Sequence, residues 1–192
     1  AITPDTILLV GSAPSYPYGV IDPIEEIAAL AKKKNLLCHV DACVGGFILP
    51  FIKELGYPIP RFDFEVDGVT SLSADIHKYG YSPKGASVVL YRTHELRKFQ
   101  FSLYTKWAGG VYGSPTITGT RSGANIAAAW AAINSIGKQG YTKMAKATMQ
   151  TPERIKQFVA ATEELELMGK TDMCIVAFKS AMIDVYMLAD EL

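Results

Sequence analysis

The chain has 192 residues, of which 19 are Lys or Arg and 19 are Asp or Glu, so its formal net charge is zero. This balance gives no electrostatic indication that the protein binds nucleic acid. The apolar fraction of 49% is enough for a sizeable core. The sequence contains no charge-free apolar run of about 18 residues, so no transmembrane helix is predicted in it.

The first predicted elements are a strand and a helix. The apolar run 6–11 predicts a strand. A helix is expected to follow, because Asp22 suits the N-cap, Pro23 the first helical position and Glu25 a capping box. Apolar residues then recur at helical spacing up to Asn35, where the helix is expected to stop.

Three further strands are predicted in the first half of the chain, over residues 36–40, 69–74 and 86–91. The last two are expected to pair antiparallel, because the short connection between them has no room for a helix. The alternation of strands and helices predicts an α/β layered fold. No internal repeat or low-complexity stretch is found.

Helices dominate the second half of the pattern. Residues 122–138 form an Ala-rich helical segment that Ser122 is expected to cap. Residues 141–164 predict a long helix that Pro152 should kink, or split with Thr151 as a new N-cap. A strand is predicted over residues 174–178.

The most informative stretch is Ser73–Gly80, where Lys78 follows a predicted buried strand. Desolvation there would lower the lysine pKa and make the amine a nucleophile, as a Schiff-base lysine requires. Asp41 ends an earlier strand and should lie at the same sheet edge. A lysine for the aldehyde and a carboxylate for the pyridine nitrogen are the minimum protein groups for pyridoxal 5′-phosphate (PLP).

Histidines and cysteines complete the set of candidate groups. In a regular strand His39 shares a face with Asp41, which would permit a hydrogen bond between them, and His94 is expected to be structural. Cys43 is expected to be structural too. The three histidines and three cysteines show no metal-ligand spacing, and the odd cysteine count argues against a disulfide framework and fits a reducing compartment.

Several motifs together resemble the sphingosine-1-phosphate lyase family, a branch of the PLP-dependent decarboxylases with the aspartate-aminotransferase fold. The resemblance is strongest over about residues 7–145 and is carried by His39–Phe47, Phe62–Phe64, Gly68–Ser71, Ser73–Tyr81, Pro83–Gly85, Gly109–Thr116, Gly119–Arg121 and Trp130–Ala132. It implies PLP-dependent transferase fold type I, with a mostly parallel sheet flanked by helices. Residues 1–140 would be the C-terminal half of the large domain, and residues 141–192 a linker helix and the start of a small C-terminal α+β domain.

The resemblance also implies roles for individual residues around the cofactor. Lys78 would carry PLP and Asp41 would pair with its ring nitrogen, while Ala42 would pack beneath the ring. His77 would donate to the cofactor phosphate. Thr120 lies in a glycine-rich segment, residues 109–123, which would cross a homodimer interface and hold the phosphate of the partner's cofactor.

The implied reaction is retro-aldol cleavage of a phosphorylated sphingoid base to a fatty aldehyde and phosphoethanolamine. Lys84, Tyr16 or the cofactor phosphate would be the base, and Lys84 and Arg121 would bind the substrate phosphate. The alternatives are an amino-acid decarboxylase on the same fold, or an inactive structural fragment. The expected location is the cytoplasm, or the endoplasmic-reticulum membrane if a eukaryotic N-terminal anchor precedes the chain.

Overall fold

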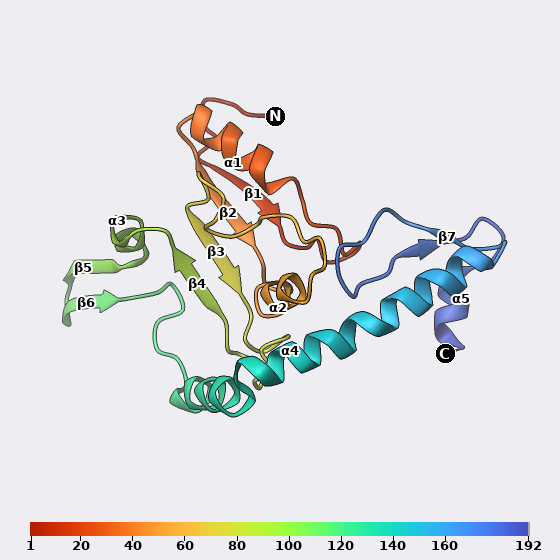
Figure 1. Ribbon diagram of the computed structural model, residues 1–192. Coiled ribbons are helices and arrows are strands. Elements are labelled where there is room, and N and C mark those ends of the chain that lie inside the picture. Colours follow the sequence, from red (N-terminus) through yellow and green to blue (C-terminus); the bar gives the residue numbers. More distant parts are fainter. Residues whose placement is uncertain (192) are drawn as a thin grey trace.

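A four-stranded mixed sheet forms the centre of the computed structural model, which describes residues 1–191 (Figure 1). Its strands lie in the order β1 (Leu8–Ser12), β2 (Leu37–Asp41), β3 (Ser71–Ala74) and β4 (Val88–Tyr91). The first three are parallel, and β4 is antiparallel to β3. The predicted α/β class and the antiparallel last pair are therefore confirmed.

Helix α1 (Ile24–Lys33) packs on β1 and β2. Its buried side chains Ile24, Ala28 and Ala31 recur at helical spacing and face the sheet. The predicted capping box is wrong: Pro23 occupies the N-cap position, and no side chain caps the helix. The carboxylate of Asp22 instead accepts a hydrogen bond from the Ser12 N–H at 2.7 Å, because the loop folds back onto the end of β1.

The two faces of the sheet differ in their surroundings. The face that includes Cys38 and Val40 is covered and belongs to one hydrophobic core, which extends to Leu49, Ile52 and Met173. Because strand side chains alternate, Asp41 lies on the other face. That face exposes several apolar side chains, namely Leu8, Val10, Leu37 and Val89.

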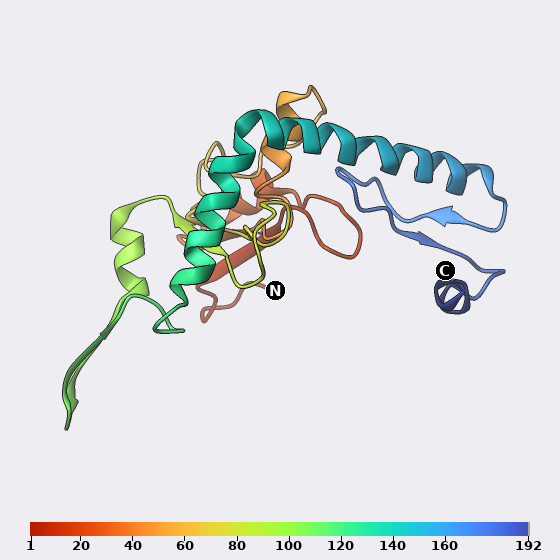
Figure 2. The same ribbon diagram turned by 90° about the horizontal axis from the view of Figure 1, so that it is seen from below.

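Three helical segments and a hairpin complete the first part. Helix α2 (Leu49–Glu54) packs against the later helix α4, and α3 (His94–Arg97) with the 3₁₀ turn η1 (Lys98–Gln100) follows β4. The antiparallel strands β5 (Ser102–Trp107) and β6 (Gly110–Ser114) form a hairpin that projects away from the sheet (Figure 2). The glycine-rich segment 109–123 is thus partly a strand, and only its second half is a loop.

Helix α4 (Gly123–Ala161) changes direction at Gly137, whose φ of 59° and ψ of 175° are not helical (Figure 2). Ser122 is the N-cap residue, although its side chain makes no capping hydrogen bond. The predicted kink or split at Pro152 is wrong. Proline has a helix-compatible φ, and the buried Pro152 ring packs within the helix without a break. Glycine, which adopts positive φ without strain, supplies the kink.

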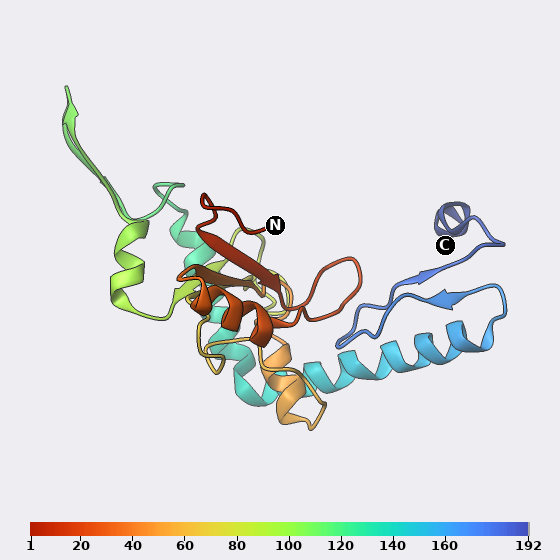
Figure 3. The same cartoon turned by 90° about the horizontal axis from the view of Figure 1, so that it is seen from above.

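The C-terminal part holds β7 (Glu166–Leu167), β8 (Phe178–Lys179) and α5 (Val185–Asp190). The strand predicted over residues 174–178 is mostly wrong, since only Phe178 belongs to one. Residues before it reach back toward the sheet, as Figure 3 shows. Helix α4 runs across the expected domain division at residue 140, and that division stays a prediction. Among residues 1–191, no helix has both the length and the apolar character needed to cross a membrane.

Candidate active site

Asp41 is the last residue of β2, at the carboxyl edge of the parallel strands. Its Oδ1 accepts hydrogen bonds from the Cys43 N–H at 3.0 Å and from the Ser73 hydroxyl at 3.3 Å. Burial raises the pKa of Asp41, but the hydrogen bonds from Cys43 and Ser73 outweigh burial, so the pKa lies below its ordinary value. The carboxylate is therefore ionised at neutral pH.

Ser73, rather than a direct contact, links His39 to Asp41. The His39 Nε2 lies 3.3 Å from the Ser73 hydroxyl, and Nδ1 lies 2.8 Å from the Ser71 hydroxyl. Burial lowers the pKa of His39 despite the nearby Asp41 carboxylate, which favours the neutral ring. A row of polar side chains thus crosses β2 and β3 on the open face of the sheet.

Lys78 lies in the turn after β3, and its Nζ has two close partners. The Asp75 Oδ2 is 3.0 Å away, and the Cys43 Sγ is also 3.0 Å away. Cys43 therefore contacts both key residues, because its N–H donates to Asp41 while its sulfur faces Lys78. Sequence positions 37 residues apart are brought into one cluster by the common edge of β2 and β3.

The sequence predicted a lowered pKa for Lys78, and this prediction is wrong for the protein without cofactor, in which the pKa is raised. Burial lowers the pKa, but the hydrogen bonds from Nζ to Cys43 and Asp75 outweigh burial and raise it. Burial is the largest single effect, but the Cys43 and Asp75 contacts together exceed it; the Lys78 side chain is 36% exposed and the Asp75 carboxylate only 14% exposed. These contacts stabilise the ammonium form of Lys78, whereas a Schiff base would require the neutral amine.

Asp75 is the residue that sequence reasoning missed. Its Oδ2 pairs with Lys78 and lies 3.5 Å from the His77 Nε2, while the Ser87 hydroxyl donates to Oδ1. A carboxylate three residues before a candidate Schiff-base lysine was a usable signal, since the two side chains meet across one turn. Asp75 thus faces two predicted site residues at once.

His77 is fixed by the neighbouring strand. Its Nδ1 lies 2.7 Å from the Ala86 carbonyl oxygen, so Nδ1 carries a proton that it donates there. The Nε2 atom is left to face Asp75 at the open edge of the turn. This geometry leaves one ring nitrogen for a ligand.

The other predicted residues are arranged more loosely. Ala42 is fully buried beside Asp41, whereas Tyr16 is 74% exposed in the loop after β1 and Lys84 is exposed in the β3–β4 turn. Thr120 is exposed, and Arg121 donates to the Thr116 and Thr118 hydroxyls. Within residues 1–191, neither Thr120 nor Arg121 has a hydrogen bond or ion pair with the Asp41–Lys78 cluster.

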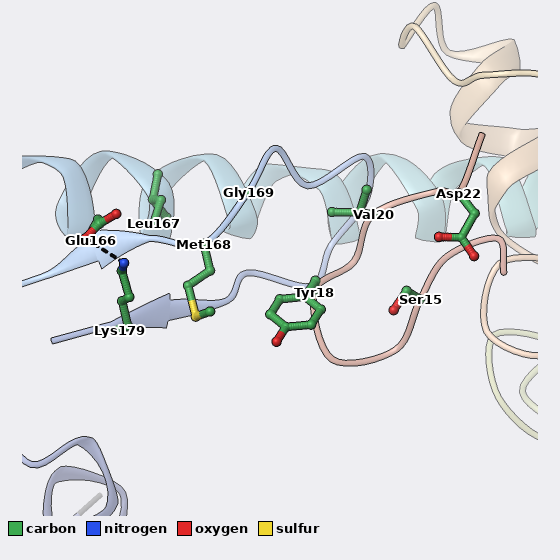
Figure 4. A pocket seen from close by; sticks show the side chains of 9 residues that line it. All are labelled: Ser15, Tyr18, Val20, Asp22, Glu166, Leu167, Met168, Gly169 and Lys179. Carbon is green, nitrogen blue, oxygen red and sulfur yellow. Dashed lines mark ion pairs between the residues drawn. The ribbon is translucent and has the colours of Figure 1, made fainter. Parts of the chain in front are cut away.

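A hollow of about 490 Å³ lies elsewhere, between the loop after β1 and the β7–β8 pair (Figure 4). Ser15, Tyr18 and Val20 line one side, and Glu166–Gly169 with Lys179 line the other. Neither Asp41 nor Lys78 lines this space. Asp41 and Lys78 therefore lie at an open edge of the sheet and not in this hollow.

The residues at this edge fit PLP. Asp41 is ionised, and its Oδ2 has no hydrogen bond within residues 1–191, so it can accept one from a protonated ring nitrogen. Lys78 supplies the amine and His77 supplies a ring nitrogen, while Ala42 is fully buried in the main hydrophobic core next to Asp41. No three His, Cys, Asp or Glu side chains of the described residues are grouped to hold a metal ion. The fold and this edge define a PLP-dependent protein of fold type I.

The profile described as the pyridoxal-dependent decarboxylase conserved domain matches residues 7–181. The chain belongs to this family, and its cofactor is PLP. The sphingosine-1-phosphate lyase of Arabidopsis thaliana is 52% identical over 98% of the chain and 35% of its own length. That of Rattus norvegicus, called sphingosine-1-phosphate lyase 1, is 46% identical over 99% of the chain and 34% of its own length.

Solved structures agree with this assignment. The sphingosine-1-phosphate lyase of Burkholderia pseudomallei superposes with a TM-score of 0.93 and 50% identity, covering 99% of the chain and 43% of that protein. The glutamate decarboxylase of Lactobacillus brevis, at 21% identity and a TM-score of 0.77, covers 94% of the chain and 43% of its own and shows the shared fold. The chain spans about a third of the length of the curated relatives it matches.

Proposed function

We propose that the protein of which these residues form part is a PLP-dependent carbon–carbon lyase acting on phosphorylated sphingoid bases. The observation that carries the proposal is the likeness to the Burkholderia pseudomallei lyase, which extends over 99% of the chain at 50% identity. Likeness to the glutamate decarboxylase is confined to the fold, at 21% identity. The lyase is therefore favoured over an amino-acid decarboxylase.

The cluster at the sheet edge supports the role of each group. Lys78 would hold the cofactor through its amine and would give up this position to the substrate amine. Asp41 would keep the ring nitrogen protonated, with Ala42 beneath the ring. His77 protonated on both ring nitrogens would donate from Nε2 to the cofactor phosphate while Nδ1 stays on the Ala86 carbonyl. When bound, PLP accepts electron density from the substrate C2 and so stabilises the negative charge that develops on this atom.

Bond cleavage requires a base near the substrate C3 hydroxyl. Lys84 or Tyr16, or the cofactor phosphate, removes this proton, and the C2–C3 bond breaks as the C3–O bond becomes an aldehyde. The electron pair of the broken bond stays with C2, which is then protonated, so the second product is phosphoethanolamine. Lys84 and Arg121 supply positive charge for the substrate phosphate.

A product analysis tests the proposal directly. The full-length protein, incubated with PLP and sphingosine 1-phosphate, should release hexadecenal and phosphoethanolamine. Release of carbon dioxide from an amino acid without any aldehyde would instead establish the decarboxylase. Lys78→Ala is the matched control, since it should abolish both the products and the absorbance of lysine-bound PLP.

The 192-residue chain by itself needs a separate test, because it spans only about a third of its relatives. PLP added to this chain should give the absorbance of a lysine-bound cofactor, and Lys78→Ala should remove it. If the wild-type chain gives no such band while the full-length protein does, these residues alone are a structural fragment.

We also propose that the active protein is a homodimer whose sites are shared between subunits. The β5–β6 hairpin supports this, because each residue of β5 is exposed and a lone hairpin is marginally stable in water. Thr120 follows this hairpin and would reach the phosphate of the partner's cofactor.

A further inference from the structure

Residues 171–175 form a strap that returns from the C-terminal part to the sheet. Figure 3 shows this segment extending toward the loop after β1. Met173 is fully buried within the main hydrophobic core, although β7 and β8 on either side of the strap lie outside that core. The strap is therefore anchored by apolar burial, which fixes the position of its polar neighbours.

The strap holds the loop that carries Tyr16. The Asp172 Oδ2 accepts a hydrogen bond from the Ile21 N–H at 2.9 Å, and the Asp172 N–H donates to the Gly19 carbonyl at 2.9 Å. The loop is closed on itself as well, since the Ser15 N–H donates to the Val20 carbonyl at 2.8 Å. Hydrogen bonds to a carboxylate are stronger than neutral ones, so Asp172 is the main fixed point.

Gly19 shows how close this contact is. Its φ is +66°, and an added Cβ would lie 2.7 Å from the Ile175 carbonyl oxygen and 2.8 Å from the Thr171 hydroxyl oxygen. Only glycine suits both the backbone conformation and the space. The Tyr16 loop and the strap therefore fit closely together, even though about 150 residues separate them in the sequence.

The same strap touches the turn that carries Lys78. The Cys174 Sγ lies 2.7 Å from the hydroxyl oxygen of Tyr79, the residue after Lys78. Burial and this contact raise the pKa of the Tyr79 hydroxyl, so Tyr79 stays neutral. One five-residue segment thus contacts both the Tyr16 loop and the Lys78 turn.

We propose that the strap is a positioning element for catalysis, in which Asp172 holds the Tyr16 loop in register with the Lys78 turn. The proposal rests on the function proposed above, and it takes Tyr16, one of the three candidate bases, as the group that removes the substrate proton. A displacement of about 1 Å between reacting groups can lower a rate about 100-fold. Asp172 itself faces main-chain groups, so it acts through the loop.

The test compares Asp172→Ala, Asp172→Asn and Asp184→Ala in the full-length holoenzyme. Asp184 is the matched control, because its carboxylate also accepts main-chain N–H bonds but caps α5 instead. We expect Asp172→Ala to lower kcat at least tenfold with unchanged absorbance of bound PLP. Asp172→Asn, which retains an acceptor oxygen, should recover most of the rate, and Asp184→Ala should behave as wild type.

Coupling to Tyr16 separates positioning from general weakening of the fold. In a Tyr16→Phe background, Asp172→Ala should cause little further loss of kcat, because both changes act through one group. Fully multiplicative losses would overturn the proposal. Amide exchange over residues 13–21 should also increase in Asp172→Ala and stay unchanged in Asp184→Ala.

The outcomes for the two proposals are distinct. If the wild-type protein binds PLP but releases no aldehyde from sphingosine 1-phosphate, the proposed function fails before any variant is compared. If wild type is active and Asp172→Ala keeps its kcat, or if its amide exchange matches wild type, the strap proposal is overturned.

Discussion

At the scale of single residues, two carboxylates of the candidate site serve different partners. Asp41 is held by N–H and O–H donors of Cys43 and Ser73 and keeps one oxygen for a ligand. Asp75 pairs with the Lys78 ammonium and raises the pKa of that amine. The amine must lose its proton before it can bind an aldehyde, so Asp75 opposes the first step of cofactor binding in this state.

Asp75→Asn should shift the pH dependence of PLP binding to lower pH. Removing the carboxylate withdraws stabilisation from the charged form of Lys78, so its pKa falls and the neutral amine is present at lower pH. The measurement is the rate at which bound-PLP absorbance appears in the full-length apoprotein as pH is varied. Glu95→Gln is a control for carboxylate loss at an exposed helix start, and its profile should match wild type. An unshifted midpoint in Asp75→Asn would contradict the assigned cause.

At the scale of elements, the turn after β2 depends on close packing of main chain. A Cβ on Gly45 would lie 2.1 Å from the Ala13 carbonyl oxygen and 2.4 Å from the Leu49 Cδ1. The turn between Asp41 and α2 thus passes close to the loop after β1. Cys43, which contacts both Asp41 and Lys78, lies in this turn.

Gly45→Ala should destabilise the full-length protein by about 1–3 kcal/mol, the usual range for overpacking a close-packed site. Gly123→Ala is the matched control, because an added Cβ there has no atom within 4 Å and alanine favours a helix. Urea unfolding of both variants measures the difference. Equal urea midpoints for Gly45→Ala and wild type would contradict the prediction, because they would show that the turn accommodates the added methyl group.

Helix α4 is tied to the Lys78 turn through Tyr141. Its ring stacks on Phe51 of α2 with centroids 5.3 Å apart, and its buried hydroxyl donates to the Gly80 carbonyl at 2.9 Å. Tyr141→Phe keeps the ring but loses the hydrogen bond, so the free energy of unfolding should fall by about 1 kcal/mol. Urea denaturation measures this, with Tyr186→Phe on the exposed face of α5 as the unchanged control. A Tyr141→Phe protein as stable as wild type would contradict the role of this bond.

At the scale of the whole molecule, the β5–β6 hairpin is one of several places where large apolar side chains are exposed. Leu103 and Val111 are each 70% exposed, and Trp107 is 56% exposed. Apolar patches of this kind indicate contact surfaces. The hairpin projects away from the core (Figure 2), which is the geometry that the proposed homodimer contact needs.

The hairpin is expected to lie in a homodimer interface of the full-length protein. Leu103→Glu combined with Val111→Glu should place charge in that interface and shift the protein toward the monomer, as light scattering would measure. Leu30→Glu, the same kind of change on α1, is the control and should leave the mass unchanged. A double variant that stays dimeric would exclude the hairpin from the interface.

The sequence by itself determined the α/β class and the strands of the central sheet, because these depend on local periodicity. It also predicted that Asp41 and Lys78 lie at the edge where the parallel strands end, and their roles there stay a prediction. Only the tertiary structure decided what surrounds them. Asp22 does not cap α1 as predicted but accepts a hydrogen bond from the Ser12 N–H. Lys78 contacts Cys43 and Asp75, which raise its pKa. The segment before β8 became a strap instead of a strand. The Asp75–Lys78 pair is local, but the Cys43–Lys78 contact and the burial of the strap depend on segments far apart in the sequence, and local propensity does not encode such contacts.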